Sequence, residues 1–286
     1  YWVDCDKGVR MVTDFLATTL AGRPAEFAGG RLANQPRRYG IVFPDTPEYR
    51  ACGNQIVAGA RSIGVDMHSA TYSLNVQAIT DRGRGIAQEF AQRGITTVLL
   101  ATDPLFPYFM TSTAALQADW RPEWIQLGAA FLDRDFSGQL YDQAQWNRAF
   151  GISLVGQTVP ARSTAAYAAY QSVDPTTSPS PYVVELAYYQ LYVLAIGLHL
   201  AGPDLTPHTF ASGMRSYVSP GAGQAGAWAF PEGQWTAPQD GRIVWWEATG
   251  TSPFNNQPGR YVDDGRRFPI GGLPDSGVTL FPNGIR

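Results

Sequence analysis

Four short runs of this chain are typical of β-strands, three of them without a charged side chain, and they alternate with stretches of helical periodicity. The runs lie at residues 39–43, 65–70, 96–101 and 124–128. The helical stretches lie at residues 6–20, 47–63, 80–92 and 106–117. Strands without polar alternation are buried on both faces of a sheet, and helices between them make the connections of parallel strands. The pattern predicts an α/β fold with a doubly wound parallel sheet, in three α/β/α layers.

The second half of the chain has a different character. Residues 172–181 are rich in Pro, Ser and Thr and predict a linker or crossover. A long helix is expected at 182–200, a shorter one at 206–217 and a strand at 242–247. The long helix is apolar nearly all round, which is typical of a helix covered on most sides. We therefore expect no membrane span in this chain and interpret 182–200 as a buried helix.

Charge and motif content exclude several classes of protein. The net charge is −3 and both signs are interspersed, so neither a nucleic acid nor an anionic membrane is expected as partner. The three histidines and two cysteines lack metal-ligand spacing, and we expect no metal and no cofactor. Residues 83–85 and 151–155 lack the pattern of a dinucleotide loop and a nucleophile elbow. Asp133, Asp135 and Asp142 are expected on a solvated surface. A non-enzymatic protein is the expectation.

The loops that follow the expected strands hold the candidate binding residues. In an open parallel sheet, ligands bind beyond the carboxyl ends of the strands. The side chains that follow those ends combine hydrogen-bonding groups with aromatic rings, as a small-molecule pocket requires. The candidates are Asp45, Thr46, Tyr49, Thr102, Asp103, Phe106 and Phe131. Ordinary capping of the helix starts by Asp45, Thr46 and Asp103 is the alternative interpretation.

Geometry also predicts a disulfide between Cys5 and Cys52. In a right-handed α-β-α unit, the two helices that flank a strand both begin at its carboxyl edge. Cys5 precedes the first helix and Cys52 lies near the start of the second. The bridge would place the protein outside the cytoplasm.

Four stretches resemble the type I periplasmic binding protein family, in particular the branched-chain amino-acid (leucine-binding) branch of ABC-transporter receptors. They are residues 39–49, 94–103, 115–128 and 181–200. The resemblance implies a second lobe at residues 1–158. It further implies a crossover, helices that cover a first lobe, and a C-terminal return at 159–286. The opening strands of that first lobe have no counterpart in the sequence, which leads us to expect a longer precursor or a companion chain.

The resemblance implies a function as well. It predicts an extracytoplasmic protein, either periplasmic or at the cell surface, with a lipid anchor on a further segment as an open alternative. Such a protein captures a small organic molecule by hinge closure and delivers it to the permease of an ABC transporter. In this chain, Tyr49 would close over the ligand, Thr102 would hydrogen-bond it and Asp103 would pair with a cationic end of the ligand. Phe106 and Phe131 would form the apolar walls.

The family's glutamate that holds an amino-acid ammonium group is replaced here by residues 128–131, Gly-Ala-Ala-Phe. The sequence therefore favours a more apolar or aromatic ligand, such as an amide or an aromatic acid, unless Asp103 supplies the charge. Two other classes stay open. A ligand-sensing domain of a receptor or regulator would share every pocket feature, and an attached signalling segment would identify it. An α/β enzyme would need Asp103 or Tyr49 paired with another titratable group.

Overall fold

The structure is a computed structural model and describes residues 3–117, 119–219, 226–274 and 277–285. The chain forms two compact units, each described separately here. Unit 2 contains Cys5–Val155, Gly241–Thr251 and Pro258–Arg286. Unit 1 contains Tyr1–Asp4, Gly156–Asp240 and Ser252–Gln257. The first two residues lie outside the described ranges.

Unit 2 is built on a sheet of eight strands among the described residues, and five of these strands are parallel. The parallel strands are β1 (Tyr39–Pro44), β2 (Met67–Tyr72), β3 (Thr97–Leu100), β4 (Glu123–Gln126) and β5 (Ala149–Ser153). The remaining strands are β8 (Asp240–Thr251), β9 (Pro258–Val262) and β10 (Phe268–Pro269). The order is β10-β8-β5-β4-β3-β1-β2, and β9 pairs with β8. The predicted doubly wound α/β fold is confirmed.

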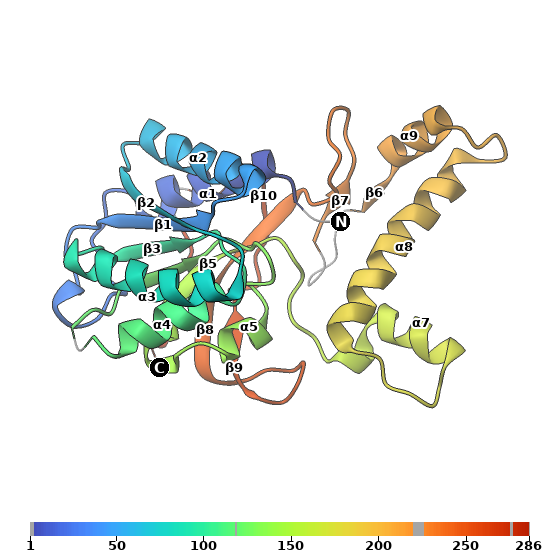
Figure 1. The fold of residues 1–286 in the computed structure, drawn as a ribbon. Helices are drawn as coiled ribbons and strands as arrows, with labels where there is room; N and C mark the ends of the chain where they lie inside the picture. The colour runs from blue at the N-terminus through green and yellow to red at the C-terminus, as the bar shows by residue number, and fades with distance from the viewer. Residues whose placement is uncertain (1–2, 118, 220–225, 275–276, 286) are drawn as a thin grey trace. The chain divides into compact units, whose positions relative to one another are not determined.

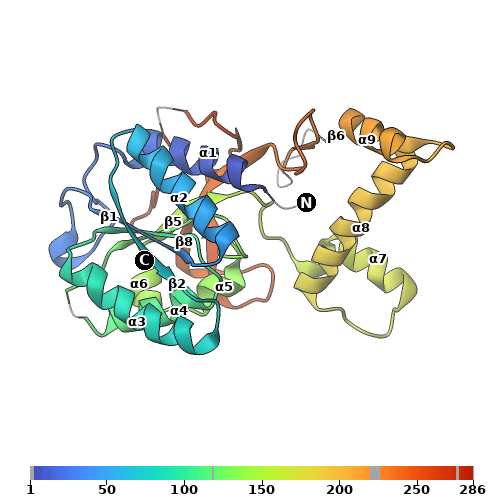
Figure 2. The same ribbon diagram turned by 45° about the horizontal axis from the view of Figure 1, so that its top comes forward.

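Helices cover both faces of this sheet (Figures 1 and 2). They are α1 (Cys5–Phe15), α2 (Pro47–Ser62), α3 (Val76–Gln92), α4 (Phe106–Ala115), α5 (Asp135–Gln139) and α6 (Gln143–Trp146). The two figures show α1 and α2 on one face and α3 and α4 on the other. Gly53 brings α2 close to the sheet, since a Cβ at this position would lie 2.5 Å from the ring of Phe43. The helices of this unit therefore pack on a sheet whose central strands, β1, β3 and β4, are fully buried.

The disulfide is confirmed. Cys5 opens α1 and Cys52 lies in α2, and their Cα atoms are 5.7 Å apart, within the range of an ordinary bridge. Both helices start beside the carboxyl end of β1, as the topology predicts. The bond joins the two helices of one layer across 47 positions of sequence.

One edge of the sheet differs from the prediction. The sequence gives no signal for β5, whereas the expected strand at 242–247 is the centre of the longer β8. The two strands pair antiparallel, with Phe150 opposite Trp245 and Ile152 opposite Ile243. The C-terminal part of the chain therefore completes the sheet of unit 2 after the residues of unit 1.

Unit 1 is mainly helical in its described part. Its helices are α7 (Ala165–Val173), α8 (Pro181–Ala201) and α9 (Pro207–Ser216), and its only strand pair there joins β6 (Val218–Ser219) to β7 (Trp228–Ala229). The predicted long helix is present, but it is exposed rather than buried. In its segment from Val183 to Ala201, only 6% of an apolar 18-residue window is buried. By length and composition alone this segment could cross a membrane, although one such helix is weak support for a span.

Candidate ligand-binding site

The strand order creates a switch point between β1 and β3. From β1 the chain moves to one side, to β2, and it then crosses back to place β3 on the other side. Crevices at such points are the usual ligand sites of open α/β sheets. Val42 pairs with Leu100, so the segments that hold Asp45 and Thr102 leave the sheet side by side. Four of the predicted residues thus lie at this edge: Asp45, Thr46, Thr102 and Asp103.

Asp103 forms a closed set of hydrogen bonds with Tyr72, the last residue of β2. The Tyr72 hydroxyl donates to Oδ2 of Asp103 at 2.5 Å and accepts from the Asp103 backbone N–H at 3.1 Å. Oδ1 of Asp103 accepts from the backbone N–H groups of Leu105 and Phe106, at 2.8 and 3.2 Å. A carboxylate offers about four acceptor positions, so these three donors leave room for one more. Asp103 therefore caps the start of α4, which agrees with the alternative interpretation of its role.

The two helices at the switch point begin differently. The start of α4 is satisfied by Asp103, whereas Thr46, the residue before α2, makes no side-chain capping bond. The first N–H groups of any helix have no acceptor within the helix, and they carry partial positive charge. Beside Thr46, the amides of Glu48 and Tyr49 belong to this first turn. The start of α2 is thus the better anchor for a carboxylate or carbonyl group.

Thr102 is buried at the same edge and has an unsatisfied hydroxyl. Its side chain is fully inaccessible, and Oγ1 has no hydrogen-bond partner among the described residues. A buried polar group without a partner is unfavourable by about 1–3 kcal/mol, so such groups are uncommon and call for an explanation. Because the side chain is closed off from solvent, a ligand group could become its partner only if the side chains that cover it move.

The loop after β4 has an unusual backbone. Gly128, Ala130 and Phe131 all have positive φ angles, of 67°, 46° and 66°. Residues other than Gly seldom adopt this conformation, and such strain gathers at functional sites. Phe131 is half-buried, and its ring lies 6.1 Å from that of Phe136. The loop therefore presents a fixed aromatic side chain close to the end of β4.

The remaining candidates lie at different depths. Tyr49 is 40% exposed on the first turn of α2, so it is accessible to a ligand. Phe106 is fully buried, and its ring stacks on that of Tyr72 with centroids 4.1 Å apart. Phe106 thus holds the ring of Tyr72 in position by stacking on it. The sequence did not identify Tyr72 or Ala130 as site residues, because the first depends on strand register and the second on backbone conformation.

The Tyr72–Asp103 pair meets the criterion that would favour an enzyme, namely a titratable partner for Asp103. Burial, followed by the bond to Asp103, raises the pKa of Tyr72 far above its ordinary value. The phenol therefore stays protonated at neutral pH and acts as a hydrogen-bond donor, and it cannot serve as a base. The geometry favours a positioning pair over an acid–base pair.

The expectation of solvated acidic residues is wrong for two of the three. Asp133 and Asp135 are each 2% exposed. Asp133 accepts a hydrogen bond from the Ser153 hydroxyl at 2.7 Å, and burial raises its pKa. Asp135 accepts from the backbone N–H of Tyr261 at 2.9 Å. Asp133 thus holds its loop to β5 and Asp135 holds α5 to β9, and spacing along the sequence carries no signal of either role.

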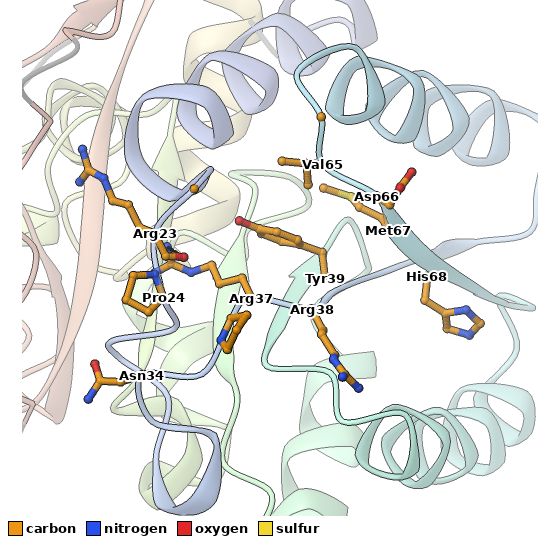
Figure 3. Close-up of a pocket in the computed structure, with 13 residues that line it drawn as sticks. Arg23, Pro24, Asn34, Arg37, Arg38, Tyr39, Val65, Asp66, Met67 and His68 are labelled. Carbon is orange, nitrogen blue, oxygen red and sulfur yellow. Dashed lines mark hydrogen bonds between the residues drawn. The ribbon is translucent and has the colours of Figure 1, made fainter.

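A separate hollow of about 750 Å³ lies at the opposite, amino edge of β1 and β2 (Figure 3). Arg37, its most buried cation, is held by Glu123 through two contacts of 2.9 Å. Figure 3 shows Arg23, Asn34 and His68 pointing away from one another. The polar groups of this hollow do not converge, so we assign the candidate site to the carboxyl edge.

Comparison with family models and with curated protein sequences gives no match. Solved structures do match. A Leu-, Ile-, Val-, Thr- and Ala-binding protein from Brucella ovis, in a closed conformation, gives a TM-score of 0.63 at 14% identity over 94% of this chain. A solute-binding protein of an ABC transporter from Rhodopseudomonas palustris BisB5, in complex with 3,4-dihydroxybenzoic acid, gives 0.62 at 9% identity over 93%. A fatty-acid ABC transporter substrate-binding protein from Thermomonospora curvata gives 0.57 at 13% identity over 93%.

These matches define the fold. The chain has the architecture of the type I periplasmic solute-binding proteins of ABC transporters, as the resemblance in sequence implied. It spans 65% of the Rhodopseudomonas protein and 64% of the Brucella protein. At 9–14% identity the likeness is one of fold, and ligand and partner are taken up as proposals.

Proposed function

We propose that this chain is the larger part of an extracytoplasmic solute-binding protein that captures a small organic molecule for an ABC transporter. The observation that carries the proposal is the buried, unpartnered Thr102 hydroxyl at the switch point, beside the uncapped start of α2. The first-turn N–H groups of α2 would hold a carboxylate, amide or carbonyl. The Thr102 hydroxyl is closed off from solvent here and would join them when the side chains that cover it move on ligand binding. The disulfide supports an oxidising location, outside the cytoplasm.

The proposal gives each candidate residue a role that fits its position. Tyr49 closes over the ligand, Asp45 and Thr46 line the path to α2, and Thr102 hydrogen-bonds the ligand. Asp103 uses its remaining acceptor position for a cationic or N–H group. Phe131 forms the apolar wall, and the buried Phe106 stacks on Tyr72 and so holds the Tyr72–Asp103 pair in place. Closure of two lobes on the ligand would then present one shape to a permease, which follows from ligand-induced population shift.

The solved proteins of this fold bind ligands that guide the choice of probes. Their ligands include branched-chain amino acids, fatty acid and a dihydroxybenzoate. All of these carry a carboxylate, which matches the open start of α2. A thermal-shift screen of the full-length gene product with leucine, octanoate, 3,4-dihydroxybenzoate and benzamide would rank the classes, and calorimetry would give the affinity of the best one.

Two substitutions test the site. Tyr49→Ala and Thr102→Val should each weaken binding of the best compound about tenfold, the effect of losing one hydrogen bond or one covering ring. Leu116→Ala is the control, because Leu116 is 88% exposed and follows the C-terminal end of α4, at the opposite edge of the sheet. If both site variants keep the affinity of the unsubstituted protein, the ligand binds elsewhere.

A further inference from the structure

Two arginines lie close together where the neighbouring strands β4 and β5 begin. Arg121 lies two positions before β4, and Arg148 directly precedes β5. The two strands are parallel neighbours, with Trp124 opposite Ala149, so the residues before them meet at one edge of the sheet. This is the amino edge, opposite to the edge where we place the small organic ligand.

Gly29 brings the two arginine side chains together. A Cβ at this position would lie 2.8 Å from Nε of Arg148 and 3.0 Å from Cβ of Arg121. Both side chains therefore pack over the same stretch of bare backbone. The N–H of Gly29 donates to the Arg121 carbonyl at 2.7 Å, which ties this loop to the start of β4. A side chain at position 29 would leave no room for the arrangement.

The guanidinium group of Arg148 is held in place by its own loop. Nη1 donates to the Ala144 carbonyl at 3.0 Å and to Oδ1 of Asn147 at 2.7 Å. Nε lies buried over Gly29 and has no hydrogen-bond partner among the described residues. Arg148 is half-buried, whereas Arg121 is exposed and makes no side-chain hydrogen bond within the described part of the chain. A fixed guanidinium thus stands beside an unbonded one.

Neither positive charge is neutralised. In the ranges that the structure describes, no carboxylate forms an ion pair with Arg121 or Arg148, whereas Arg37 is paired with Glu123. Asp119, two positions before Arg121, is exposed and pairs with neither of them there. Burial, followed by the charge of Arg121, lowers the pKa of Arg148. Two like charges in a partly buried position are unfavourable until an anion joins them.

We propose that Arg121 and Arg148 bind an oxyanion with two negative charges, of the sulfate or phosphate type. A guanidinium presents a planar fork of N–H donors that matches two oxygens of such an anion, and hydrogen bonds between charged groups are the strong ones. Two guanidinium groups supply two positive charges, which a sulfate ion or a phosphate monoester balances. The site does not depend on the proposed solute site, because the two lie at opposite edges of the sheet.

Calorimetric titration with sodium sulfate at low ionic strength tests the site. The unsubstituted protein should show saturable binding below about 10 mM, where general exclusion of sulfate from protein surfaces produces no saturable heat. Arg121→Gln should weaken this binding at least about tenfold, through loss of one charge and its hydrogen bonds. Arg84→Gln should leave it unchanged. Arg84 is the matched control, because it is an exposed arginine on α3 without an ion pair among the described residues.

Two results would overturn the proposal. One is the absence of saturable sulfate binding to the unsubstituted protein, and the other is equal affinity of the Arg121 and Arg84 variants. The Tm of Arg121→Gln at low salt provides a check on folding. It should stay unchanged or rise by about 1–2 °C, because the substitution removes a like charge from beside Arg148. A lower Tm would contradict the unfavourable pairing of the two charges.

Gly29→Ala tests the geometry without changing any charge. The φ angle of Gly29 is −112°, a value that alanine adopts readily, so the backbone stays unstrained. The new Cβ would displace the guanidinium of Arg148, and sulfate affinity should fall at least about threefold. An unchanged affinity would show that the position of Arg148 over Gly29 does not matter for the anion.

Phenyl phosphate distinguishes a free ion from a phosphoryl group on a larger molecule. At pH 8 it carries about two negative charges, as sulfate does, but on an organic group. Binding of both compounds with the same dependence on Arg121 would assign the site to an attached phosphoryl group as well as to the ion. Binding of sulfate alone would assign it to the free ion. These titrations use none of the organic solutes above, so the two proposals fail independently.

Discussion

The hydroxyl of Tyr72 and the carboxylate of Asp103 are 2.5 Å apart and link the ends of two strands that are not neighbours. β1 lies between β2 and β3, so the contact spans the carboxyl end of β1. This bond fixes the loop that carries Thr102 and sets the start of α4. The edge of the sheet is thus held rigid at the point where we place the ligand.

Tyr72→Phe removes that link without changing the shape of the ring. Loss of a hydrogen bond to a charged group should lower the free energy of unfolding by about 1.5–3 kcal/mol in urea denaturation. Tyr108 is an exposed tyrosine on α4. Tyr108→Phe should change the free energy of unfolding by less than about 0.5 kcal/mol. Equal effects of the two variants would show that the Tyr72–Asp103 bond does not hold this edge.

Thr102→Val should separate binding from stability. Its buried hydroxyl has no partner among the described residues, so an isosteric methyl group should leave stability unchanged or raise it by up to about 1 kcal/mol. Ligand affinity should fall in the same variant. Thermal denaturation gives the first quantity and calorimetry the second. A loss of stability greater than about 1 kcal/mol would mean that the hydroxyl is needed by the fold itself.

Reduction of the disulfide should destabilise the protein. A bridge of this span stabilises a fold by about 2–4 kcal/mol, mainly through restriction of the unfolded chain. Cys5→Ser with Cys52→Ser should therefore lower the Tm by several degrees. A phosphine reductant should reproduce this shift in the unsubstituted protein and have no effect on the double variant. Identical melting with and without reductant would show that the cysteines are not joined.

The buried ion pair between Arg37 and Glu123 should be sensitive to loss of either charge. Glu123 is fully buried and also accepts from the Thr97 hydroxyl at 2.7 Å. Glu123→Gln leaves the Arg37 guanidinium buried without its counter-charge, which should lower the free energy of unfolding by about 3–5 kcal/mol. Glu89→Gln removes a more exposed pairing with His68 and should have an effect below about 1 kcal/mol. Denaturant titration of both variants measures the difference.

Buried tyrosines should make the fold sensitive to alkali. Burial raises the pKa of Tyr39 to about 12, and it raises those of Tyr72, Tyr141 and Tyr261 as well. A tyrosine in the unfolded chain titrates at about pH 10. Below that pH the tyrosines are protonated in both the folded and the unfolded state, so their full contribution to the free energy of unfolding is present. Between about pH 10 and 12 the unfolded state loses its protons first, and the free energy of unfolding falls.

Denaturation in urea at a series of pH values should show this fall, and absorbance at 295 nm should report the phenolates. Tyr39 alone contributes at most about 2–3 kcal/mol over this range. Tyr39→Phe should therefore make the profile less steep between pH 10 and 12, while Tyr72, Tyr141 and Tyr261 keep the rest of the fall. A profile as steep as that of the unsubstituted protein would show that Tyr39 ionises equally in both states.

Much of the parallel sheet and the disulfide could be predicted from the sequence. Runs such as 96–101 are continuous because both faces of the strand are covered, and the position of Cys52 follows from the handedness of the connection. β5 could not be predicted, since its five residues include Gly151 and lack a clear period. The pairing of β5 with β8 joins distant parts of the chain, and no local pattern encodes it.

The candidate site was predictable to a similar extent. Residues such as Asp45 and Thr102 follow strand ends, so the topology alone brings them to one edge. Tyr72 required the register of β2 against β1, which hydrophobic pattern does not give. The positive φ of Ala130 has no signal in an alanine, because this conformation is associated with Gly, Asn and Asp. The burial of Asp133 likewise depends on strands far away in sequence.

The late arrival of β8 has a consequence during synthesis. Once β5 has formed, its free side stays open until the residues of unit 1 have been made and β8 can pair with it. At 5–20 residues per second this interval lasts roughly ten seconds. An open strand edge is a template for pairing with another chain. During this interval, the open β5 edges of two nascent chains on neighbouring ribosomes could pair with each other. The order of elements along the chain sets how long the interval lasts.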